Sequence, residues 1–380
     1  MKKKTKIGNR VTLGRKPSMR TVRWIHRLAV SIPVYCLLIG IPIILTVEIE
    51  LLKDERILRL VLLIILLIFC CVLTRGIVIK VGMYAIKKTL SDFTPDRLIN
   101  RFKECSPKVG YFGPKQDQLV LCFHGFTSSP MEFEFLADRL RKERIDFYAP
   151  LIQGFGQIRQ DMLFKLFKED WFREIIDIYD LLTPRYKRIS VVGHSMGGML
   201  ACFLAQNRPI ENLILSAPAI FPQKRENLYA WAIKSRMLHA VLSWTVPMFP
   251  KPLRGGRYAP ADTLDEESAY RYFQYLVAPI RSMFGMLEAQ AMVDLEKLNF
   301  TSLSLLYGAH DITVDNIAIE RHLKRKGVPF QRFVFENTAH NIFVDNDRFR
   351  VNSTIMGILQ GNQSGSNPFP NSIDSRSVHE

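Results

Sequence analysis

Short apolar runs alternate with amphipathic segments along the chain from about residue 105 onwards. Runs rich in β-branched and aromatic residues predict strands, and apolar residues that recur every three or four positions predict helices. The predicted strands lie at 118–123, 145–150, 189–192, 212–218, 302–308 and 330–336, and the predicted helices at 130–142, 169–182, 199–206, 315–325 and 346–359. This alternation predicts a mostly parallel sheet that is covered by helices on both faces and binds ligands at the carboxyl ends of its strands.

One connection in this pattern is much longer than the others. More than 80 residues separate the predicted strands 212–218 and 302–308, whereas a crossover between parallel strands needs only about a dozen. Residues of about 219–300 therefore predict an inserted helical cap. The segment is dense in Trp, Tyr, Phe, Met and Leu, which could line an acyl channel. The same side chains could instead pack the cap onto the core, because both tasks need an apolar helix face.

Two strongly apolar runs precede the alternating pattern. Residues 28–47 carry no charge over 20 positions, about the length of a helix that spans a bilayer. The second run, 60–73, covers 14 residues, or roughly 21 Å as a helix. It reaches a full span at about 57–77 if the arginines at its two ends extend to the headgroups. Residues 28–78 therefore predict a transmembrane helical hairpin.

The distribution of lysine and arginine predicts the orientation of this hairpin. Ten of these residues lie at 1–27, two at 48–56 and seven at 75–103. Because cytoplasmic flanks carry the excess of positive charge, the N-terminus and the large C-terminal domain are both expected in the cytoplasm. A cleaved signal peptide is one alternative, although no small-residue cleavage site follows the first run. A re-entrant second run, which would put the domain outside, is the other.

The net charge of +16 arises mostly from one tail. Residues 1–27 contain ten lysines and arginines and no acidic residue, and without those ten the net charge is +6. A basic cytoplasmic tail accounts for the excess, so no nucleic-acid partner is predicted. At the other end, residues 361–380 are rich in Ser, Asn, Gly and Pro without periodicity, which predicts a disordered tail.

The remaining composition is that of a chain with one large core. Its hydrophobic content is 48%, enough for a single large domain at 105–360 in addition to the apolar runs. Six cysteines occur without a C-x-x-C pair, which indicates neither a zinc site nor a disulfide framework and suits a reducing compartment. No metal and no cofactor are expected.

The sequence GHSMG at 193–197 lies between a predicted buried strand and a predicted helix. In this context G-x-S-x-G is a nucleophile elbow, whose glycines let the backbone turn sharply enough to lift the serine above the sheet. A serine hydroxyl is a poor nucleophile at neutral pH, so Ser195 needs a base and an acid that orients the base. A purely structural turn is the alternative until such partners are found.

Candidate partners follow the later strands. Asp311 comes directly after an apolar strand, and His340 comes after the last predicted strand. Their order, serine then acid then histidine, is the one expected of α/β-hydrolases. Neighbouring residues of suitable type, His194, His310 and Asp315, are expected to be structural.

Acyl transfer also needs two N–H donors for the oxyanion that develops on the carbonyl oxygen. One is expected from the backbone of Met196, directly after the serine. The other is expected from Phe126, in the stretch CFHGFTSSP, where a strand ends before a predicted helix. A simple glycine turn is the alternative for this second loop.

Five stretches now carry a resemblance: CFHGFTSSP, LIQGFG, VVGHSMGG, YGAHDITV and NTAHNIF. Their order and approximate spacing resemble those of bacterial carboxylesterases and monoacylglycerol lipases of the α/β-hydrolase superfamily, which also contains serine aminopeptidase-like hydrolases. The resemblance covers about residues 115–360 and not the apolar runs. It implies an α/β-hydrolase fold, with Ser195, Asp311 and His340 as the triad and Phe126 and Met196 as oxyanion donors. Phe155 stands where the family usually has a histidine, which leaves the shape of the acyl pocket open.

The residues and the resemblance together predict a membrane-anchored serine carboxylesterase or lipase of a bacterial cytoplasmic membrane. Its expected substrates are medium or long acyl esters, such as monoacylglycerols or lysophospholipids, and membrane lipids are the expected partners. A peptidase of the serine aminopeptidase type that uses the same triad is one alternative. A non-catalytic membrane scaffold is another, which a missing triad member would favour. The sequence leaves the oligomeric state open.

Overall fold

The computed structural model describes residues 56–90, 105–114, 116–155, 168–221, 236–250, 262–265, 268 and 277–361. Three predicted features lie outside the described residues: the basic tail 1–27, the first apolar segment 28–47 and the C-terminal tail beyond Gly361. The cap predicted at about 219–300 is described in part.

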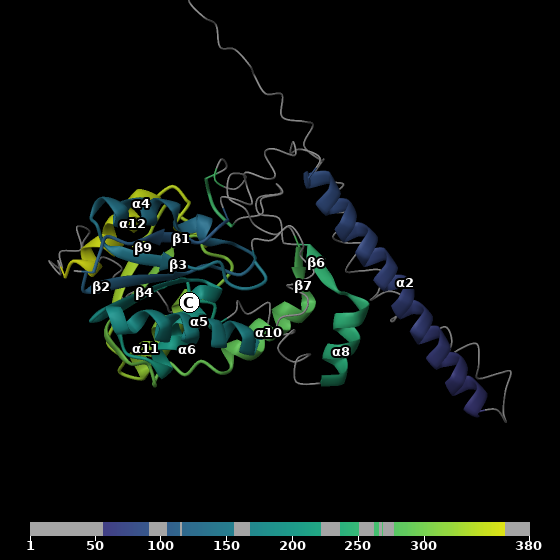
Figure 1. The fold of residues 1–380 in the computed structure, drawn as a ribbon. Helices are drawn as coiled ribbons and strands as arrows, with labels where there is room; N and C mark the ends of the chain where they lie inside the picture. Colours follow the sequence, from purple (N-terminus) through teal and green to yellow (C-terminus); the bar gives the residue numbers. More distant parts are fainter. Residues whose placement is uncertain are drawn as a thin grey trace, which may run out of the picture.

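A seven-stranded sheet forms the centre of the main domain, with the strand order β1-β3-β2-β4-β5-β8-β9 (Figure 1). Neighbouring strands run parallel except at one edge, where β1 pairs antiparallel with β3. The strands are β1 (Lys108–Gly110), β2 (Gln118–Phe123), β3 (Asp146–Ala149), β4 (Arg188–His194), β5 (Ile210–Ser216), β8 (Phe300–Gly308) and β9 (Gln331–Phe335). The mostly parallel sheet predicted from the alternating pattern is therefore present.

Helices cover both faces of the sheet (Figure 1). One face carries α4 (Glu134–Lys142) and α12 (Arg348–Leu359), and the other carries α5 (Lys168–Leu182), α6 (Met196–Asn207) and α11 (Asn316–Arg325). Strand β2 packs against both helical layers. Leu119, Leu121 and Phe123 belong to the apolar cluster that includes α5 and α6. Val120 and Cys122 belong to the apolar cluster that includes α4 and α12. Side chains alternate across a strand, so burial on both faces requires the continuous apolar run seen in the sequence.

The predicted strands and helices after residue 105 are present within a few residues of their predicted bounds. The helix predicted at 130–142 begins as the 3-10 helix Pro130–Phe133 and continues as α4. The hydrophobic pattern does not predict β1, or the antiparallel pair β6 (Met248–Pro250) and β7 (Val277–Pro279). Each of these strands is three residues long, too short to show an alternation of apolar and polar positions.

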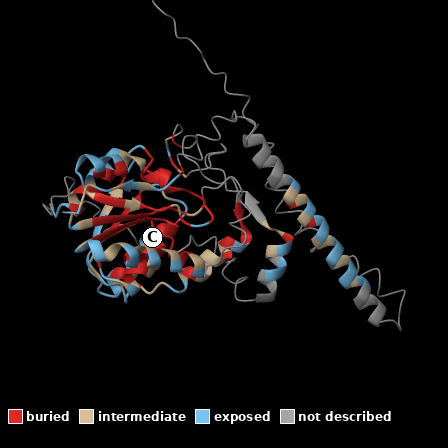
Figure 2. Cartoon of the chain, in the orientation of Figure 1, coloured by how far each residue is buried: buried red, intermediate tan, exposed pale blue. Residues whose placement is uncertain are grey.

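The described parts of the insertion between β5 and β8 contain helices, as predicted for a cap. They are α8 (Arg236–Thr245) and α10 (Ile280–Gln290), with β6 and β7 between them in sequence. Ala289 of α10 is fully buried in the apolar cluster beside α5 and α6, so this end of the insertion packs on the main domain. Figure 2 shows the buried residues concentrated in and around the central sheet.

A long helix, α2 (Arg56–Leu90), stands apart from the sheet (Figure 1). The part of the chain that the structure describes contains one helix long and apolar enough to cross a membrane, at Leu62–Lys80 within α2, judged by length and composition alone. Exposed apolar side chains along it include Ile65, Ile68 and Phe69. The second predicted membrane segment, 57–77, lies within α2, but the helix continues to Leu90. The hairpin itself is not supported beyond this single helix.

The start of α6 passes very close to the end of β2. A Cβ atom on Gly197 would lie 1.8 Å from the carbonyl oxygen of Phe123, and a Cβ atom on Gly193 would lie 2.4 Å from the carbonyl oxygen of Gly197. Real Cβ atoms do not make such contacts, so only glycine allows these backbones to pack together. Both glycines of GHSMG are therefore required by packing as well as by the turn.

We expect Gly197→Ala to destabilise the protein by about 1–3 kcal/mol or more, because the added methyl group meets backbone that cannot move aside. Gly357→Ala in α12 is the matched control, since a Cβ atom there has no neighbour within 4 Å. Alanine in a helix is about 0.5–1 kcal/mol more favourable than glycine, so the control should be slightly stabilised. Urea unfolding of both variants measures the difference, and a Gly197→Ala protein as stable as the wild type would contradict this packing.

Candidate active site

Ser195 lies in the turn between β4 and α6, at the carboxyl end of a central strand. Its φ of 54° and ψ of −114° fall in a region that non-glycine residues rarely occupy, at a cost on the order of 1–3 kcal/mol. Two backbone hydrogen bonds of 2.9 Å hold the turn. The Ser195 N–H donates to the carbonyl oxygen of Ser216, and the Ala219 N–H donates to the carbonyl oxygen of Ser195. The strained conformation expected of a nucleophile elbow is thus fixed by β5 and the residues that follow it.

Asp311 and His340 meet at the same edge of the sheet. The Nδ1 atom of His340 lies 2.9 Å from Oδ2 of Asp311. The aspartate also accepts hydrogen bonds from the N–H of Thr313 at 2.8 Å, the N–H of Val314 at 3.1 Å and the side-chain amide of Asn316 at 2.9 Å. A carboxylate with this many donors is fixed in its ionised form. The Nδ1 atom of His340 therefore carries the proton, and Nε2 of the neutral imidazole is a free base.

The loops that carry these two residues approach each other at Gly308, the last residue of β8. We call residues 309–315 the acid loop and residues 336–347 the histidine loop. A Cβ atom on Gly308 would lie 2.2 Å from the carbonyl oxygen of Ala339 and 2.3 Å from that of Thr338. Glycine at this position therefore lets the histidine loop lie directly against the end of β8, next to the acid loop.

The electrostatics of the pair favour the charged forms. Burial alone would raise the pKa of Asp311 and lower the pKa of His340, because each charged form loses solvation. The opposite charge of the partner and the hydrogen bond between them outweigh this effect. The pKa of Asp311 is therefore held below its usual value, and the pKa of His340 is held above its own. An imidazolium formed by proton transfer would be stabilised at this position.

His340 lies beside the serine turn. Its ring centroid is 5.0 Å from that of His194, the residue that precedes Ser195. Within the described part of the chain, the imidazole is hydrogen-bonded to Asp311 and not to the serine hydroxyl. Catalytic hydrogen bonds are often long in unliganded proteins and tighten when substrate binds. The structure thus brings Asp311 and His340 together and puts the imidazole beside the residue that precedes Ser195.

The loop after β2 lies directly over the serine turn. A Cβ atom on Gly125 would lie 3.2 Å from Cδ2 of His194 and 3.5 Å from the Cβ atom of Ser195, so this loop is in contact with the serine turn. The buried carboxylate of Glu132 holds the loop, because Oε1 accepts the Gly125 N–H at 3.0 Å and Oε2 accepts the Ser128 hydroxyl at 2.7 Å. The loop is therefore anchored on both sides of Phe126.

The two predicted oxyanion donors belong to this loop and to α6. Met196 is the first residue of α6, so its N–H has no intrahelical acceptor and lies at the positive end of the helix dipole. The Phe126 N–H has no backbone acceptor among the described residues. Thr127 follows with a φ of 62°, which is rare for a β-branched residue, and its hydroxyl donates to the Phe126 oxygen at 2.6 Å. This bond orients the peptide group after Phe126. The peptide group that carries the Phe126 N–H is held through the Gly125 oxygen, which accepts the Ser128 N–H at 3.1 Å.

Phe155 is fully buried. Its ring packs edge-on against His124 and Phe126, with centroid distances of 5.4 Å and 5.7 Å. His124 accepts the Ile152 N–H on Nε2 at 3.1 Å, so its Nδ1 carries the proton and donates to the Gly125 oxygen at 2.9 Å. Burial lowers the pKa of His124 to about 4, which keeps the ring neutral. Phe155 and His124 therefore support the loop of Phe126 from the core.

The three neighbouring residues that could compete for catalytic roles are placed differently. His194 is buried, with Nδ1 3.1 Å from the Ser216 hydroxyl, and burial lowers its pKa well below the usual value. Asp315 is the N-cap of α11 and accepts the Ala318 N–H at 2.9 Å. His310 is exposed. The expectation that His194 and Asp315 are structural agrees with these contacts.

Two residues that shape the site were not found by sequence reasoning. Glu132 follows Ser129 by three residues, a capping-box spacing that predicts a helix start but not a contact with Gly125. Asn316 follows the N-cap of α11, and only the folded chain brings its amide to Asp311. Both contacts depend on loop geometry that local patterns do not encode.

Possible metal ligands do not cluster in the described residues. These residues contain no group of three or more His, Cys, Asp and Glu side chains that could hold a metal ion. Burial raises the pKa of the Cys122 and Cys202 thiols. Buried thiols of this kind are poor nucleophiles.

Comparison with known proteins identifies the family. The family model described as "Serine aminopeptidase, S33" matches residues 114–347, more than half of the 380 residues. A thermostable monoacylglycerol lipase of Bacillus sp. (strain H-257) is 36% identical over 90 residues, 24% of this chain and 36% of the lipase. The uncharacterized hydrolase YugF of Bacillus subtilis (strain 168) is 32% identical over 92 residues, 24% of this chain and 33% of that protein. The chain thus matches about a third of the length of these relatives.

Solved structures give the same fold over a longer stretch. The structure reported for the metagenome-derived lipolytic enzymes LipS and LipT has a TM-score of 0.55 at 19% identity, and covers 68% of this chain and 98% of that one. A monoacylglycerol lipase of Paleococcus ferrophilus has a TM-score of 0.53 at 18% identity, and covers 67% of this chain and 98% of its own. Together with the parallel sheet and the turn at Ser195, these matches identify the protein as a member of the serine aminopeptidase S33 family, with the α/β-hydrolase fold.

Proposed function

We propose that the protein is a membrane-anchored serine hydrolase that cleaves carboxylic esters. Ser195 is the nucleophile, His340 the general base and Asp311 the residue that orients the base. The observation that carries this proposal is the hydrogen bond between His340 Nδ1 and Asp311 Oδ2, beside a serine held in a strained turn. Together with two N–H donors for the oxyanion, this arrangement of three residues can run acyl transfer in two steps.

The first step is attack on the ester carbonyl. Neutral His340 takes the proton of the Ser195 hydroxyl on Nε2 as Oγ bonds to the carbonyl carbon, and the carbonyl electrons move to the oxygen. The resulting oxyanion is stabilised by the N–H groups of Phe126 and Met196, each of which contributes about 2.7–4 kcal/mol in comparable sites. Asp311 stabilises the imidazolium through the Nδ1 hydrogen bond.

The second step releases the alcohol and regenerates the enzyme. The imidazolium of His340 donates its Nε2 proton to the leaving alkoxide as the carbonyl re-forms, which leaves an acyl group on Ser195. Water then takes the place of the alcohol. It attacks the acyl carbon as it loses a proton to Nε2, which forms a second oxyanion. The second oxyanion collapses, the carboxylic acid leaves, and the proton returns to the serine oxygen.

The substrate class rests on the relatives and on the insertion. One curated relative is a monoacylglycerol lipase, and the insertion between β5 and β8 is rich in aromatic, Leu and Met residues, which suit an acyl pocket. We therefore propose medium or long acyl esters, such as monoacylglycerols or lysophospholipids. The family description favours a second candidate, cleavage of a peptide with the same triad. Comparing turnover of acyl esters with that of aminoacyl amides separates the two.

The proposal includes anchoring in the membrane by apolar segments at 28–47 and 57–77, with the N-terminus and the catalytic domain in the cytoplasm. The exposed apolar surface of α2 supports it. The contact of α2 with the insertion also supports anchoring in the membrane. The Arg75 guanidinium donates to the carbonyl oxygen of Trp244 and lies 5.2 Å from the centroid of the Trp244 ring. Tryptophan is enriched at membrane interfaces, so this contact supports a cap held beside the bilayer.

Replacement of the nucleophile is the first test. Ser195→Ala should lower kcat for a p-nitrophenyl ester by about 10⁴-fold or more, because the covalent step is lost while oxyanion and binding effects remain. Ser353→Ala, on the exposed face of α12, is the control and should retain wild-type turnover. Circular dichroism checks that both proteins are folded. Substantial hydrolysis by the folded Ser195→Ala protein would exclude Ser195 as the nucleophile.

The pH profile tests the roles of the acid and the base. Since His340 must be neutral to accept a proton, kcat/KM should rise with pH through a pKa above the usual value of histidine. Asp311→Asn removes the anion that raises this pKa, so the acid limb should move to lower pH and kcat at neutral pH should fall by about 10³- to 10⁴-fold. Asp315→Asn preserves an N-cap and should change neither quantity. Reversed effects of the two substitutions would mean that the acid is Asp315.

Removal of the apolar segments tests the membrane part of the proposal. Deleting residues 1–100 should release the protein from membranes and leave hydrolysis of soluble esters intact, because the triad and the central sheet lie after residue 105. Turnover of lipid in vesicles should fall relative to turnover of a soluble ester, because tethering keeps the site at a high effective concentration beside its substrate. An unchanged ratio of the two rates would reject a role of the anchor in substrate delivery.

A further inference from the structure

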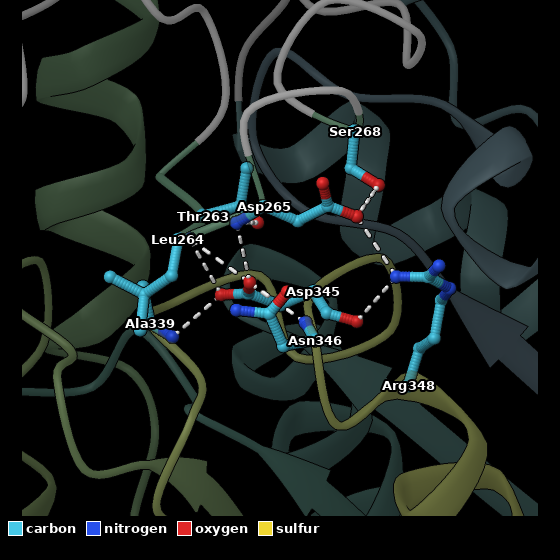
Figure 3. Close-up of polar contacts among 8 residues, drawn as sticks. All are labelled: Thr263, Leu264, Asp265, Ser268, Ala339, Asp345, Asn346 and Arg348. Carbon is cyan, nitrogen blue, oxygen red and sulfur yellow. Dashed lines mark hydrogen bonds and ion pairs between the residues drawn. The ribbon is translucent and has the colours of Figure 1, made fainter.

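The carboxylate of Asp345, in the histidine loop, is fully buried and accepts hydrogen bonds from four backbone N–H groups (Figure 3). Oδ2 accepts the N–H of Ala339 at 2.7 Å and that of Leu264 at 2.9 Å. Oδ1 accepts the N–H of Asp265 at 2.9 Å and that of Asn346 at 2.9 Å. Leu264 and Asp265 belong to the insertion. One buried charge therefore joins the insertion to the loop that carries His340.

The backbone on both sides of His340 is tied to these partners. The N–H of Ala339, directly before the histidine, donates to Asp345 at 2.7 Å. The N–H of Asn341, directly after it, donates to the carbonyl oxygen of Asp262 at 3.0 Å. Because the residues on both sides of His340 are held through their N–H groups, Asp345 and the segment 262–265 of the insertion restrict the position of the His340 Cα.

The same segment reaches the acid loop. The Thr313 hydroxyl donates to Oδ2 of Asp262 at 2.8 Å, and the Thr313 N–H donates to the Asp311 carboxylate at 2.8 Å. The charge of Asp262 also contributes to the raised pKa of His340. The segment 262–265 therefore lies between the histidine loop and the acid loop and contacts both.

A second layer of contacts holds the segment in place (Figure 3). The Arg348 guanidinium donates to the Asp265 carboxylate at 2.9 Å and to the carbonyl oxygen of Asp345 at 3.0 Å. The Ser268 hydroxyl donates to the Asp265 carboxylate at 2.8 Å. This part of the insertion is thus bound to the main domain by charged and polar groups, which have stricter distance and angle requirements than apolar packing.

We propose that Asp345 is a positioning residue for the general base, and that the segment 262–265 of the insertion is the second half of this support. The inference rests on the proposed function of Ser195, Asp311 and His340. The insertion is then part of the catalytic framework: its central segment sets the distance between His340 and Asp311. A displacement of this segment changes the strength of the His340–Asp311 hydrogen bond and so the basicity of the imidazole.

Asp345→Asn is the direct test, because the two side chains have the same shape but the amide nitrogen cannot accept a hydrogen bond. At least one of the N–H groups that meet the carboxylate then loses its partner. Asp347→Asn is the matched control: Asp347 lies in the same loop and accepts the N–H of Asn337 at 3.0 Å and the hydroxyl of Thr338 at 3.3 Å, and neither residue adjoins the histidine. Thr313→Val is a further variant, which removes the hydroxyl contact with Asp262 and leaves the histidine loop unchanged.

The measurement is the rate of inactivation of the full-length protein by a fluorophosphonate as a function of pH. Asp345→Asn should lower the limiting rate about 10- to 100-fold, as expected for a misplaced catalytic group. It should also move the acid limb to lower pH, because a weaker bond to Asp311 no longer raises the pKa of His340. Thr313→Val should shift the acid limb in the same direction by a smaller amount, and Asp347→Asn should match the wild type.

The pH at which the acid limb lies distinguishes a positioning defect from a loss of stability. A partly unfolded variant gives less labelled protein, but the pKa of His340 in its folded fraction is unchanged. An Asp345→Asn profile with the wild-type rate and acid limb would overturn the inference while the proposed function stands. If Asp345→Asn does not fold, Thr313→Val tests the inference instead. An acid limb at lower pH than in the wild type supports the inference, and an acid limb at the wild-type pH overturns it. A wild-type protein that takes no probe at Ser195 would overturn the proposed function and the inference together.

Discussion

The close contact between the start of α6 and the end of β2 sets the geometry on which the rest of the site depends. Gly197 lies against the carbonyl group of Phe123, where no Cβ atom fits, and this contact fixes the turn that holds Ser195 at a φ of 54°. The same contact brings the loop after β2 over the serine, so that the turn of Ser195 and the loop of Phe126 follow two neighbouring parallel strands. Gly308 plays the corresponding part for the histidine loop, which lies against the end of β8. Close backbone packing at these glycines thus brings the parts of the site together, independently of the polar contacts.

Three carboxylates then order the three loops around the serine. Glu132 accepts the N–H of Gly125, Asp311 accepts those of Thr313 and Val314, and Asp345 accepts that of Ala339. Charge-assisted hydrogen bonds to backbone N–H groups are stronger than neutral ones, and a buried carboxylate is costly unless such donors surround it. Each loop is therefore held in the one conformation that satisfies its carboxylate. In the proposed mechanism these loops carry the oxyanion donor, the orienting acid and the base, so their rigidity is what keeps the reacting groups aligned.

Much of this arrangement could be predicted from the sequence, because it depends on local patterns. Continuous apolar runs such as 118–123 predict strands buried on both faces, and GHSMG between a strand and a helix predicts the turn at Ser195. The contacts of Asp345 with Leu264, and of Asn316 with Asp311, could not be predicted, because they join segments by loop geometry and not by periodicity. Strand β1 is three residues long and is recognised only through its pairing with β3. The continuation of α2 to Leu90 was also missed, since the apolar run that marks it ends at residue 73.

The most direct test of the account is a crystal structure of the protein inactivated by a long-chain alkyl fluorophosphonate. The account predicts a covalent bond between phosphorus and the Ser195 Oγ atom. It also predicts that the phosphoryl oxygen, which stands for the oxyanion, lies within about 2.7–3.1 Å of the backbone nitrogens of both Phe126 and Met196. The alkyl chain should extend toward the insertion between β5 and β8. An adduct on any other residue, or a phosphoryl oxygen directed away from these two nitrogens, would contradict the account.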